Sequence, residues 1–330
     1  MSKTKLIAAL LAGAFFAAGA NAAWTPDKPV EFIITSGAGG GTDTFTRTIQ
    51  SIITKNKLMS VSIVALNKGG GAGSEGYVYG ASEQTNPYRV TFGTNNEYLL
   101  PLVAKMGYAA EGFVPVAALA LDEFLIWVNA KSPFKDARSF IEAARKGEGL
   151  RAGGSQSKDT DQTLVSIISE ATGAKFTYIP FKSGGEAGIQ LAGGHIDTNV
   201  NNPNENIGQW KGSMVRPLCV FSVKRMAAGP KVTKDQSWSD IPTCTEVGIP
   251  VDSYQMPRTI WLPAGVSQEV VAFYSELMAK VRQTPEWKEY ITRTSQTDTF
   301  LAGDDLRSYI TKDTARAYGV FKREGWLAIK

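Results

Sequence analysis

The chain has 330 residues, a formal net charge of +4 at pH 7 and a hydrophobic content of 43%. This length predicts two domains with ample core, since a domain usually holds roughly 100 to 200 residues. The charge is too small for the clustered basic face of a nucleic-acid-binding protein, and one histidine with two cysteines gives too few ligands for a zinc or iron–sulfur site. We therefore expect no nucleic acid, no metal and no cofactor.

The first 22 residues have the pattern of an export signal. Lys3 and Lys5 precede an apolar run over residues 6–18, and Ala20-Asn21-Ala22 fits a cleavage site of the small-x-small type. The run is shorter than the roughly 20 apolar residues of a transmembrane helix. We expect cleavage after Ala22 and a soluble, monomeric mature protein in the periplasm.

Short β-rich segments alternate with helical segments in the mature chain, which is typical of a parallel α/β sheet. In the first half we predict strands over residues 30–35, 61–66, 89–94 and 114–121, and helices over residues 42–57, 74–82 and 97–106. After an apolar run at 124–128 we predict helices over 137–146, 161–172, 185–192 and 204–211, and strands over 150–152, 175–180, 196–200 and 215–221. Amphipathic helices at 267–283, 285–293 and 304–325 follow, and they are expected to complete one of these two units.

The loop after the first strand reads Ser36-Gly37-Ala38-Gly39-Gly40-Gly41-Thr42-Asp43. Ligands of open α/β sheets bind at the carboxyl ends of the strands, and a glycine-rich loop that opens a helix directs free N–H groups at an anion. The loop therefore predicts a site for a carboxylate or phosphate. The alternative is a tight turn in which Thr42 or Asp43 caps the helix. A dinucleotide site is disfavoured, because Thr42 stands where the third glycine of that motif belongs.

Other strand-to-helix loops carry small polar residues that are expected at the same edge. The glycine cluster at residues 69–73 either shapes the cleft wall or is purely structural. The further candidates for ligand contact are Thr94, Asn95, Ser155, Gln156, Ser157, Thr160, Asp161, Ser183 and Asn202. Loops from two different α/β units that lead into helices can hold one ligand from opposite sides.

Several segments together resemble a known family. They are WTPDKPVEFIITSGAGGGTDTFTR, GGGAGSEG, RAGGSQSKDTDQ, YIPFKSGGEAGIQLAGGHIDT, RPLCVFSVKR, DIPTCTEVGIP and IWLPAGVSQEVV. Their order resembles the extracytoplasmic solute receptors of tripartite tricarboxylate transporters, the TctC or Bug family, over essentially the whole mature chain. The resemblance implies a type II periplasmic binding-protein fold. In that fold two α/β domains joined by two crossover strands close on a small organic acid.

The resemblance also implies where the domains and site residues lie. The crossovers would use residues 124–128 outward and 256–262 on return, so domain 1 would comprise residues 23–124 and 256–330, and domain 2 residues 125–255. The first loop matches the family best, with Ser36, Gly39, Gly40, Gly41, Thr42 and Asp43 at the ligand and the amides near Gly39 to Gly41 as carboxylate donors. For Asp43, itself an anion, we expect helix capping, a bridging water or contact with a ligand donor. In the second domain this chain has Asp159-Thr160-Asp161 where relatives often have a histidine.

Three further features come from this chain alone. Arg258, near the return crossover, is expected either to hold a carboxylate with two hydrogen bonds or to form a salt bridge at the surface or between the domains. His195 falls in the turn before a strand, at the wrong edge of the sheet, so we expect a solvated side chain. Cys219 and Cys244 either form a disulfide or remain two buried thiols.

These observations predict a receptor that captures a small organic carboxylate and delivers it to membrane permease subunits. Di- and tricarboxylates, aromatic acids and nicotinate-like acids all remain open as ligands. The alternatives are an exported sensing subunit that docks on a membrane sensor kinase and, less favoured, an exported hydrolase. A Ser-His hydrolase would depend on the single His195, and Ser157 with Lys158 are adjacent residues that usually point apart.

Overall fold

The structure is a computed structural model that describes residues 24–328, so the predicted export signal lies outside the described residues. The strands are β1 (Val30–Ile34), β2 (Ile63–Asn67), β3 (Arg89–Gly93), β4 (Phe113–Glu123), β5 (Leu125–Asn129), β6 (Arg151–Ser155), β7 (Thr177–Phe181), β8 (Thr198–Asn199), β9 (Val215–Val220), β10 (Gln255–Pro263) and β11 (Thr297–Leu301). The α-helices are α1 (Gly41–Lys55), α2 (Ser74–Ala81), α3 (Asn96–Val103), α4 (Ala137–Arg145), α5 (Thr160–Thr172), α6 (Gly184–Ala192), α7 (Pro203–Lys211), α8 (Gln268–Arg282), α9 (Pro285–Thr294) and α10 (Gly303–Arg323).

The first sheet has the strand order β11-β4-β10-β3-β1-β2. Strands β1, β2 and β3 are parallel, whereas β10 is antiparallel to both β3 and β4. Side chains alternate across a strand, so Ile260 and Leu262 of β10 pack with α1, α8 and α9, while Trp261 packs with α2, α3 and α10 on the opposite face. The C-terminal helices therefore complete the first unit, as predicted.

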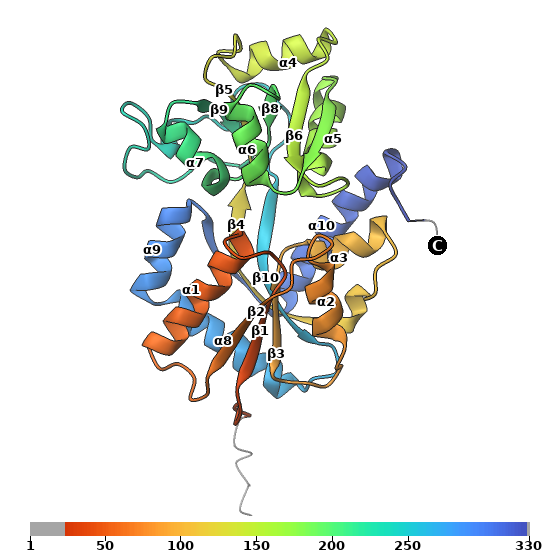
Figure 1. The fold of residues 1–330 in the computed structure, drawn as a ribbon, viewed down its shortest axis with the longest axis vertical. Helices are drawn as coiled ribbons and strands as arrows, with labels where there is room; N and C mark the ends of the chain where they lie inside the picture. Colours follow the sequence, from red (N-terminus) through yellow and green to blue (C-terminus); the bar gives the residue numbers. More distant parts are fainter. Residues whose placement is uncertain (1–23, 329–330) are drawn as a thin grey trace, which may run out of the picture.

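The second sheet has the order β7-β6-β8-β5-β9. Helices α4 and α5 pack on one face, where Phe140 and Leu164 are fully buried. Helices α6 and α7 cover the other, where Trp127 of β5 lies against Trp210 with the ring centroids 5.8 Å apart. Figure 1 shows these elements together in the upper part of the molecule, above the first sheet.

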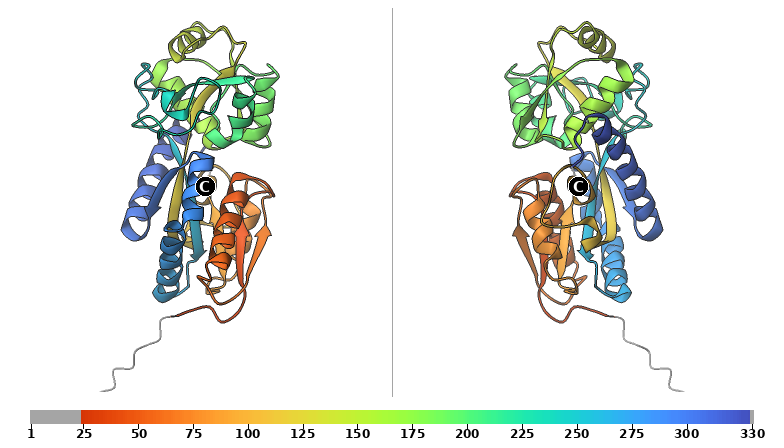
Figure 2. Two further views of the ribbon diagram at one scale, coloured as in Figure 1. Left: turned by 90° about the vertical axis from the view of Figure 1, so that its left-hand side faces the viewer. Right: turned by 90° about the vertical axis from the view of Figure 1, so that its right-hand side faces the viewer.

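The chain passes between the two sheets along β4 and β10, which pair antiparallel over their whole length. Figure 2 shows both strands extending from the lower unit toward the upper one. The outward passage differs from the prediction, because residues 125–128 already belong to β5 of the second sheet and only Phe124 separates β4 from β5. The domain limits at 124/125 and 255/256 remain a prediction.

The predicted strands and helices are present, with ends displaced by a few residues and with β8 reduced to two. Two further features, both of the sheets, differ from the prediction. Both sheets are mixed rather than parallel, because each includes strands that run antiparallel to a neighbour. The edge strand β11 was not predicted, since its sequence TDTFL is short and mostly polar.

Cys219 of β9 and Cys244 form a disulfide in the core of the second unit, with their Cα atoms 4.9 Å apart. The first of the two alternatives for this pair is therefore the one found. The bond joins β9 to the irregular segment that leads back to the first sheet. The disulfide holds this segment, residues 241–254, in place, although the segment contains no helix or strand.

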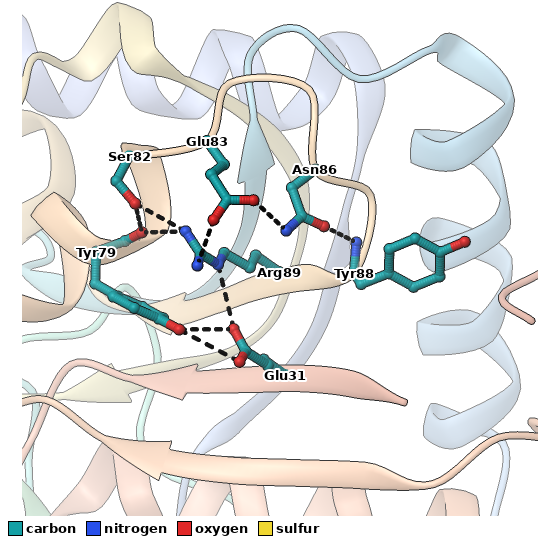
Figure 3. Close-up of polar contacts among 7 residues, drawn as sticks. All are labelled: Glu31, Tyr79, Ser82, Glu83, Asn86, Tyr88 and Arg89. Atoms are coloured by element: carbon teal, nitrogen blue, oxygen red, sulfur yellow. Dashed lines mark hydrogen bonds and ion pairs between the residues drawn. The ribbon is translucent and has the colours of Figure 1, made fainter. Parts of the chain in front are cut away.

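A polar cluster closes the amino-terminal end of the first sheet, opposite the carboxyl ends of its parallel strands (Figure 3). Arg89, at the start of β3, donates from Nε to Glu31 Oε2 over 3.2 Å and from Nη1 to Ser82 Oγ over 2.8 Å, and it pairs with Glu83. Its guanidinium also lies 4.1 Å from the ring centre of Tyr79. No residue of this cluster lines the cavity that residues of both units form.

Candidate functional site

Six helices from both domains begin at one cavity of about 510 Å³. Their N-cap or first residues in its wall are Gly41 for α1, Gly73 for α2, Asn96 for α3, Thr160 for α5, Gly184 for α6 and Asn202 for α7. A helix N-terminus carries unpaired N–H groups and the positive end of the helix dipole, so their convergence favours a bound anion.

Two groups of residues face each other across this cavity. We call the first jaw the lining residues from the first domain, which are Thr35, Ser36, Gly37, Ala38, Gly39, Gly40, Gly41, Thr42, Gly69, Ala72, Gly73, Tyr77, Thr94, Asn96, Met256 and Arg258. We call the second jaw the lining residues from the second domain, which are Ser155, Gln156, Asp159, Thr160, Asp161, Lys182, Ser183, Gly184, Asn202 and Glu205.

The glycine-rich loop of the first jaw leaves the first turn of α1 open. The N–H groups of Gly41 and Thr42 donate to no acceptor among the residues that the structure describes, and no side chain caps this helix. The amides of Gly39 and Gly40 are already used within the loop, by Asp43 and by the Gly37 carbonyl. The free donors therefore begin at Gly41, later than the sequence predicted.

Asp43 organises this loop from behind. Its Oδ2 accepts the Gly39 N–H over 2.8 Å, and its Oδ1 accepts from Arg47 Nε and Asn67 Nδ2, each over 2.8 Å. Burial acts to raise the pKa of Asp43, but the hydrogen bonds from Gly39, Asn67 and Arg47 hold it below the ordinary value. The carboxylate does not line the cavity, so its place fits loop organisation rather than ligand contact.

The second glycine cluster packs directly on the first loop. A Cβ atom on Gly69 would lie 2.5 Å from the Gly37 nitrogen, a clash that only glycine avoids because it has no Cβ atom. Gly69, Ala72 and Gly73 also line the cavity. The cluster therefore has both expected roles. Its close approach supports the first loop, and the same approach makes it part of the cavity wall.

Arg258 is buried in the first jaw and is already paired. It is 5% exposed; Nη2 forms a salt bridge with Asp122 of β4, and Nη1 donates to Thr42 Oγ1 over 3.0 Å. Its Nε has no hydrogen-bond partner among the described residues. The salt bridge of Arg258 is therefore buried within the first domain, rather than at the surface or between the domains as one alternative predicted; Arg258 also lines the cavity, where its charge is largely balanced by Asp122.

The second jaw is built on acidic side chains at the start of α5. The single hydroxyl proton of Ser155 is shared between Asp161 Oδ2 at 3.0 Å and Asp159 Oδ2 at 3.2 Å, and Asp161 Oδ2 also accepts the Ser155 N–H over 2.7 Å. Burial raises the pKa of Asp159. Burial, with the added charge of Glu205 and Asp159, raises the pKa of Asp161 well above its ordinary value.

Glu205, in the first turn of α7, adds a third carboxyl group to this wall. Its Oε2 accepts the Asn202 N–H over 3.2 Å. Burial raises the pKa of Glu205 to about 7; the charges of Asp122 and Asp159 act in the same direction, against the hydrogen bond from Asn202 and the charge of Arg258. The sequence analysis missed this residue, although an Asn followed three positions later by Glu is a recognisable helix start.

Most of the predicted contact residues meet at this cavity, and three do not. Those that line it are Ser36, Gly39, Gly40, Gly41, Thr42, Thr94, Ser155, Gln156, Thr160, Asp161, Ser183, Asn202 and Arg258. Those outside its lining are Asp43, Asn95 and Ser157. Lining residues that were not among the candidates include Thr35, Tyr77, Asp159, Lys182, Glu205 and Met256.

Asn95 serves the contact between the domains instead. Its Nδ2 donates to Asp313 Oδ2 over 3.2 Å, and its Oδ1 accepts from Thr160 Oγ1 over 3.4 Å. Tyr98 Oη donates to the same Asp313 oxygen over 2.9 Å. Asn95 therefore joins α10 of the first domain to the start of α5 in the second.

Other features of the sequence lie away from the cavity. His195 is exposed in the turn between α6 and β8, as predicted. Within residues 24–328, no group of three or more His, Cys, Asp or Glu side chains is arranged to hold a metal ion. None of the helices in that part of the chain is long and apolar enough to cross a membrane.

The sequence profile of the tripartite tricarboxylate transporter family receptor, TctC, matches residues 46–325. The chain belongs to this receptor family. It is 24% identical to protein BugT of Bordetella pertussis, over 98% of this chain and 99% of BugT. The resemblance stated from the sequence is therefore confirmed, and the family is one of solute receptors rather than enzymes.

Solved structures of similar proteins confirm the type II periplasmic binding-protein fold with its two domains. An R. palustris protein with adipate matches at 23% identity and a TM-score of 0.78, covering 92% of this chain and 99% of that chain. MatC from Rhodopseudomonas palustris with bound malate matches at 18% identity and a TM-score of 0.73, covering 89% of this chain and 99% of that chain. At these identities the likeness concerns the fold.

Proposed function

We propose that this protein is a periplasmic receptor that captures a small organic carboxylate and delivers it to the permease subunits of a tripartite tricarboxylate transporter. The observation that carries the proposal is the convergence of six helix N-termini on one cavity, with the Gly41 and Thr42 amides without an acceptor among the described residues. Membership of the receptor family supports it. The adipate and malate bound to two proteins of the same fold support a carboxylate ligand.

The proposed contacts are the polar residues and amides that line the cavity. They are Ser36, Gly41, Thr42, Thr94, Ser155, Gln156, Thr160, Asp161, Ser183, Asn202 and Arg258. Micromolar affinity requires about 8 kcal/mol. A hydrogen bond to a charged group contributes roughly 1.5 to 3 kcal/mol, so four to six such contacts are sufficient after the cost of ordering.

Domain closure would couple capture to delivery. Only Phe124 separates β4 from β5, and β10 brings the chain back, so little backbone restrains rotation of one domain on the other. Ligand that contacts both jaws stabilises the closed arrangement. We propose that the permease recognises this closed form, in which both domains present one fixed surface.

A thermal-shift screen of di-, tri- and monocarboxylates in the mature protein tests the proposal. A ligand at 100 times its dissociation constant should stabilise the fold by about 2.7 kcal/mol and raise the melting temperature by several degrees. Gly37→Leu is a variant designed to block the cavity. A Cβ atom at Gly37 meets nothing within 4 Å, so the variant should fold normally while its side chain narrows the cavity and abolishes the shift.

The proposal fails if no carboxylate in a broad panel raises the melting temperature. Turnover of a chromogenic ester by the wild type, lost in Gly37→Leu, would instead support a hydrolase. A shift of equal size in Gly37→Leu would place the ligand outside this cavity.

A further inference from the structure

The two jaws of the cavity differ in charge. The first jaw contains no carboxyl group among its lining residues, and its one cation, Arg258, is paired with Asp122. The second jaw contains three carboxyl groups, on Asp159, Asp161 and Glu205. Its one cation, Lys182, is exposed and forms no ion pair with any described residue.

Asp161 has hydrogen-bonding capacity that the protein does not use. The residue is 5% exposed and lines the cavity. Both of its hydrogen bonds, from the Ser155 N–H and hydroxyl, go to Oδ2. Oδ1 accepts no hydrogen bond within residues 24–328, and neither does Oε1 of Glu205. Neither oxygen is among the fully buried side-chain atoms that lack a partner, so both are open to the cavity, where a donor on the ligand can reach them.

Helix capping accounts for only part of this acidic wall. Asp159 is the N-cap of α5; its Oδ1 accepts the Thr160 N–H, and its Oδ2 shares the Ser155 hydroxyl proton with Asp161. Asp136 caps α4 in the same way without lining the cavity. The unpaired oxygens of Asp161 and Glu205 are not explained by capping.

We propose that the ligand is an amino-bearing carboxylate. Its carboxylate lies on the first-turn amides of α1, and its ammonium group lies against Asp161 with Glu205 beside it. This inference rests on the proposed function, because it assigns the ligand of the same cavity. The reason is charge matching: an ammonium group supplies donors to the unpaired oxygens and offsets the mutual repulsion of the three carboxyl groups.

A dicarboxylate without an amino group fits this wall poorly. Its second carboxylate would lie toward three acidic groups, where Lys182 at the exposed rim offers only a solvent-screened charge. Such a ligand requires these carboxyl groups to keep their protons, as the raised pKa of Asp161 and of Glu205 favours in the empty protein, whereas an ammonium group pairs with their ionised form, which a higher pH favours. The chemistry of the wall thus selects between acids of similar size that differ in one amino group.

Isothermal titration calorimetry at pH 8 with two matched pairs tests the inference. The pairs are malate with aspartate and adipate with 2-aminoadipate, in which the amino group is the main difference. We expect the amino member of at least one pair to bind about tenfold more tightly or better. Asp161→Asn should weaken binding of the amino member by about tenfold and leave its partner nearly unchanged.

Asp136→Asn is the matched control, because it makes the same change at a helix start of the same domain, away from the cavity. It should leave all affinities unchanged. If Asp161→Asn does not fold, Glu205→Gln serves as the second variant and should reduce the same preference for the amino member.

The inference is overturned if the acids that bind lack an amino group, or if Asp161→Asn and Glu205→Gln leave the preference unaltered. In those cases carboxylate binding itself would still stand. Absence of binding by any carboxylate would overturn the proposed function, and this inference with it.

Discussion

Replacement of Arg258 provides a sharp test of how the first jaw is held together. The Arg258 side chain is 6% exposed and that of its partner Asp122 is 1% exposed, so the pair is removed from water. Arg258→Met keeps the length and removes the charge. It leaves Asp122 buried with Gln296 as its remaining hydrogen-bond donor.

The expected cost follows from the burial of both groups. Removing one member of a buried ion pair destabilises a protein by about 3 to 5 kcal/mol, because the other charge stays buried without its partner. For a chain of this size that corresponds to a fall in the melting temperature on the order of 10 °C. Arg258→Met combined with Asp122→Asn removes both charges and should recover part of that loss.

Calorimetry and urea unfolding measure the stabilities of the wild type, the two single variants and the double variant. Arg89→Met is the matched control, since Arg89 is a half-buried arginine in the polar cluster at the far end of the same sheet. Both arginine variants should lose stability, but only Arg258→Met should lose carboxylate affinity, by about tenfold or more. A stability loss below about 1 kcal/mol for Arg258→Met would refute the reasoning about the pair. An unchanged affinity would remove Arg258 from the site.

Three further changes have defined outcomes. Asp43→Ala leaves the Gly39 N–H without its acceptor. We expect the free energy of unfolding, measured with urea, to fall by about 2 to 4 kcal/mol and every carboxylate to bind more weakly. Full affinity would show that the loop keeps its conformation without Asp43. The raised pKa of Glu205 means that the empty protein keeps a proton which the unfolded chain loses, so its contribution to stability is complete below about pH 4.5 and is lost as the pH rises through about 7. The free energy of unfolding of the wild type should therefore fall relative to that of Glu205→Gln over this range, by up to about 1.4 kcal/mol per pH unit, and parallel curves would contradict the assignment. Reduction of the Cys219–Cys244 disulfide, which spans 25 residues, should cost about 3 kcal/mol without changing affinity, and a large change in affinity would mean that the cross-link positions the second jaw.

The sequence was sufficient for the alternation of strands and helices, because hydrophobic period and glycine-rich boundaries are local signals. It was also sufficient for the edge at which the loops meet, since the carboxyl ends of parallel strands share one edge. It did not reveal β11, whose five residues pair with β4 although they lie far along the chain. The exit from the first sheet was placed late, at residues 124–128, because Asp122 and Glu123 interrupt the apolar pattern although β4 continues through both.

Side-chain direction in the site depended on partners that are distant in sequence. Asp43 turns away from the cavity because Asn67, at the end of β2, donates to it. Asn95 turns toward Asp313 of α10 for the same kind of reason. Neither partner can be assigned from the loops alone. The spacing of Cys219 and Cys244 along the chain likewise does not determine the distance between them in space. A disulfide and two buried thiols were therefore equally compatible with the sequence, and only the fold brings the two residues together.

The central claim is that one carboxylate lies between the two jaws. A crystal structure of the mature protein with the acid that gives the largest thermal shift tests it most directly. We predict a carboxylate oxygen within about 3.2 Å of the Gly41 or Thr42 nitrogen, and further contacts from the second jaw. A ligand bound elsewhere, or one whose carboxylate contacts only the second jaw, would contradict this account.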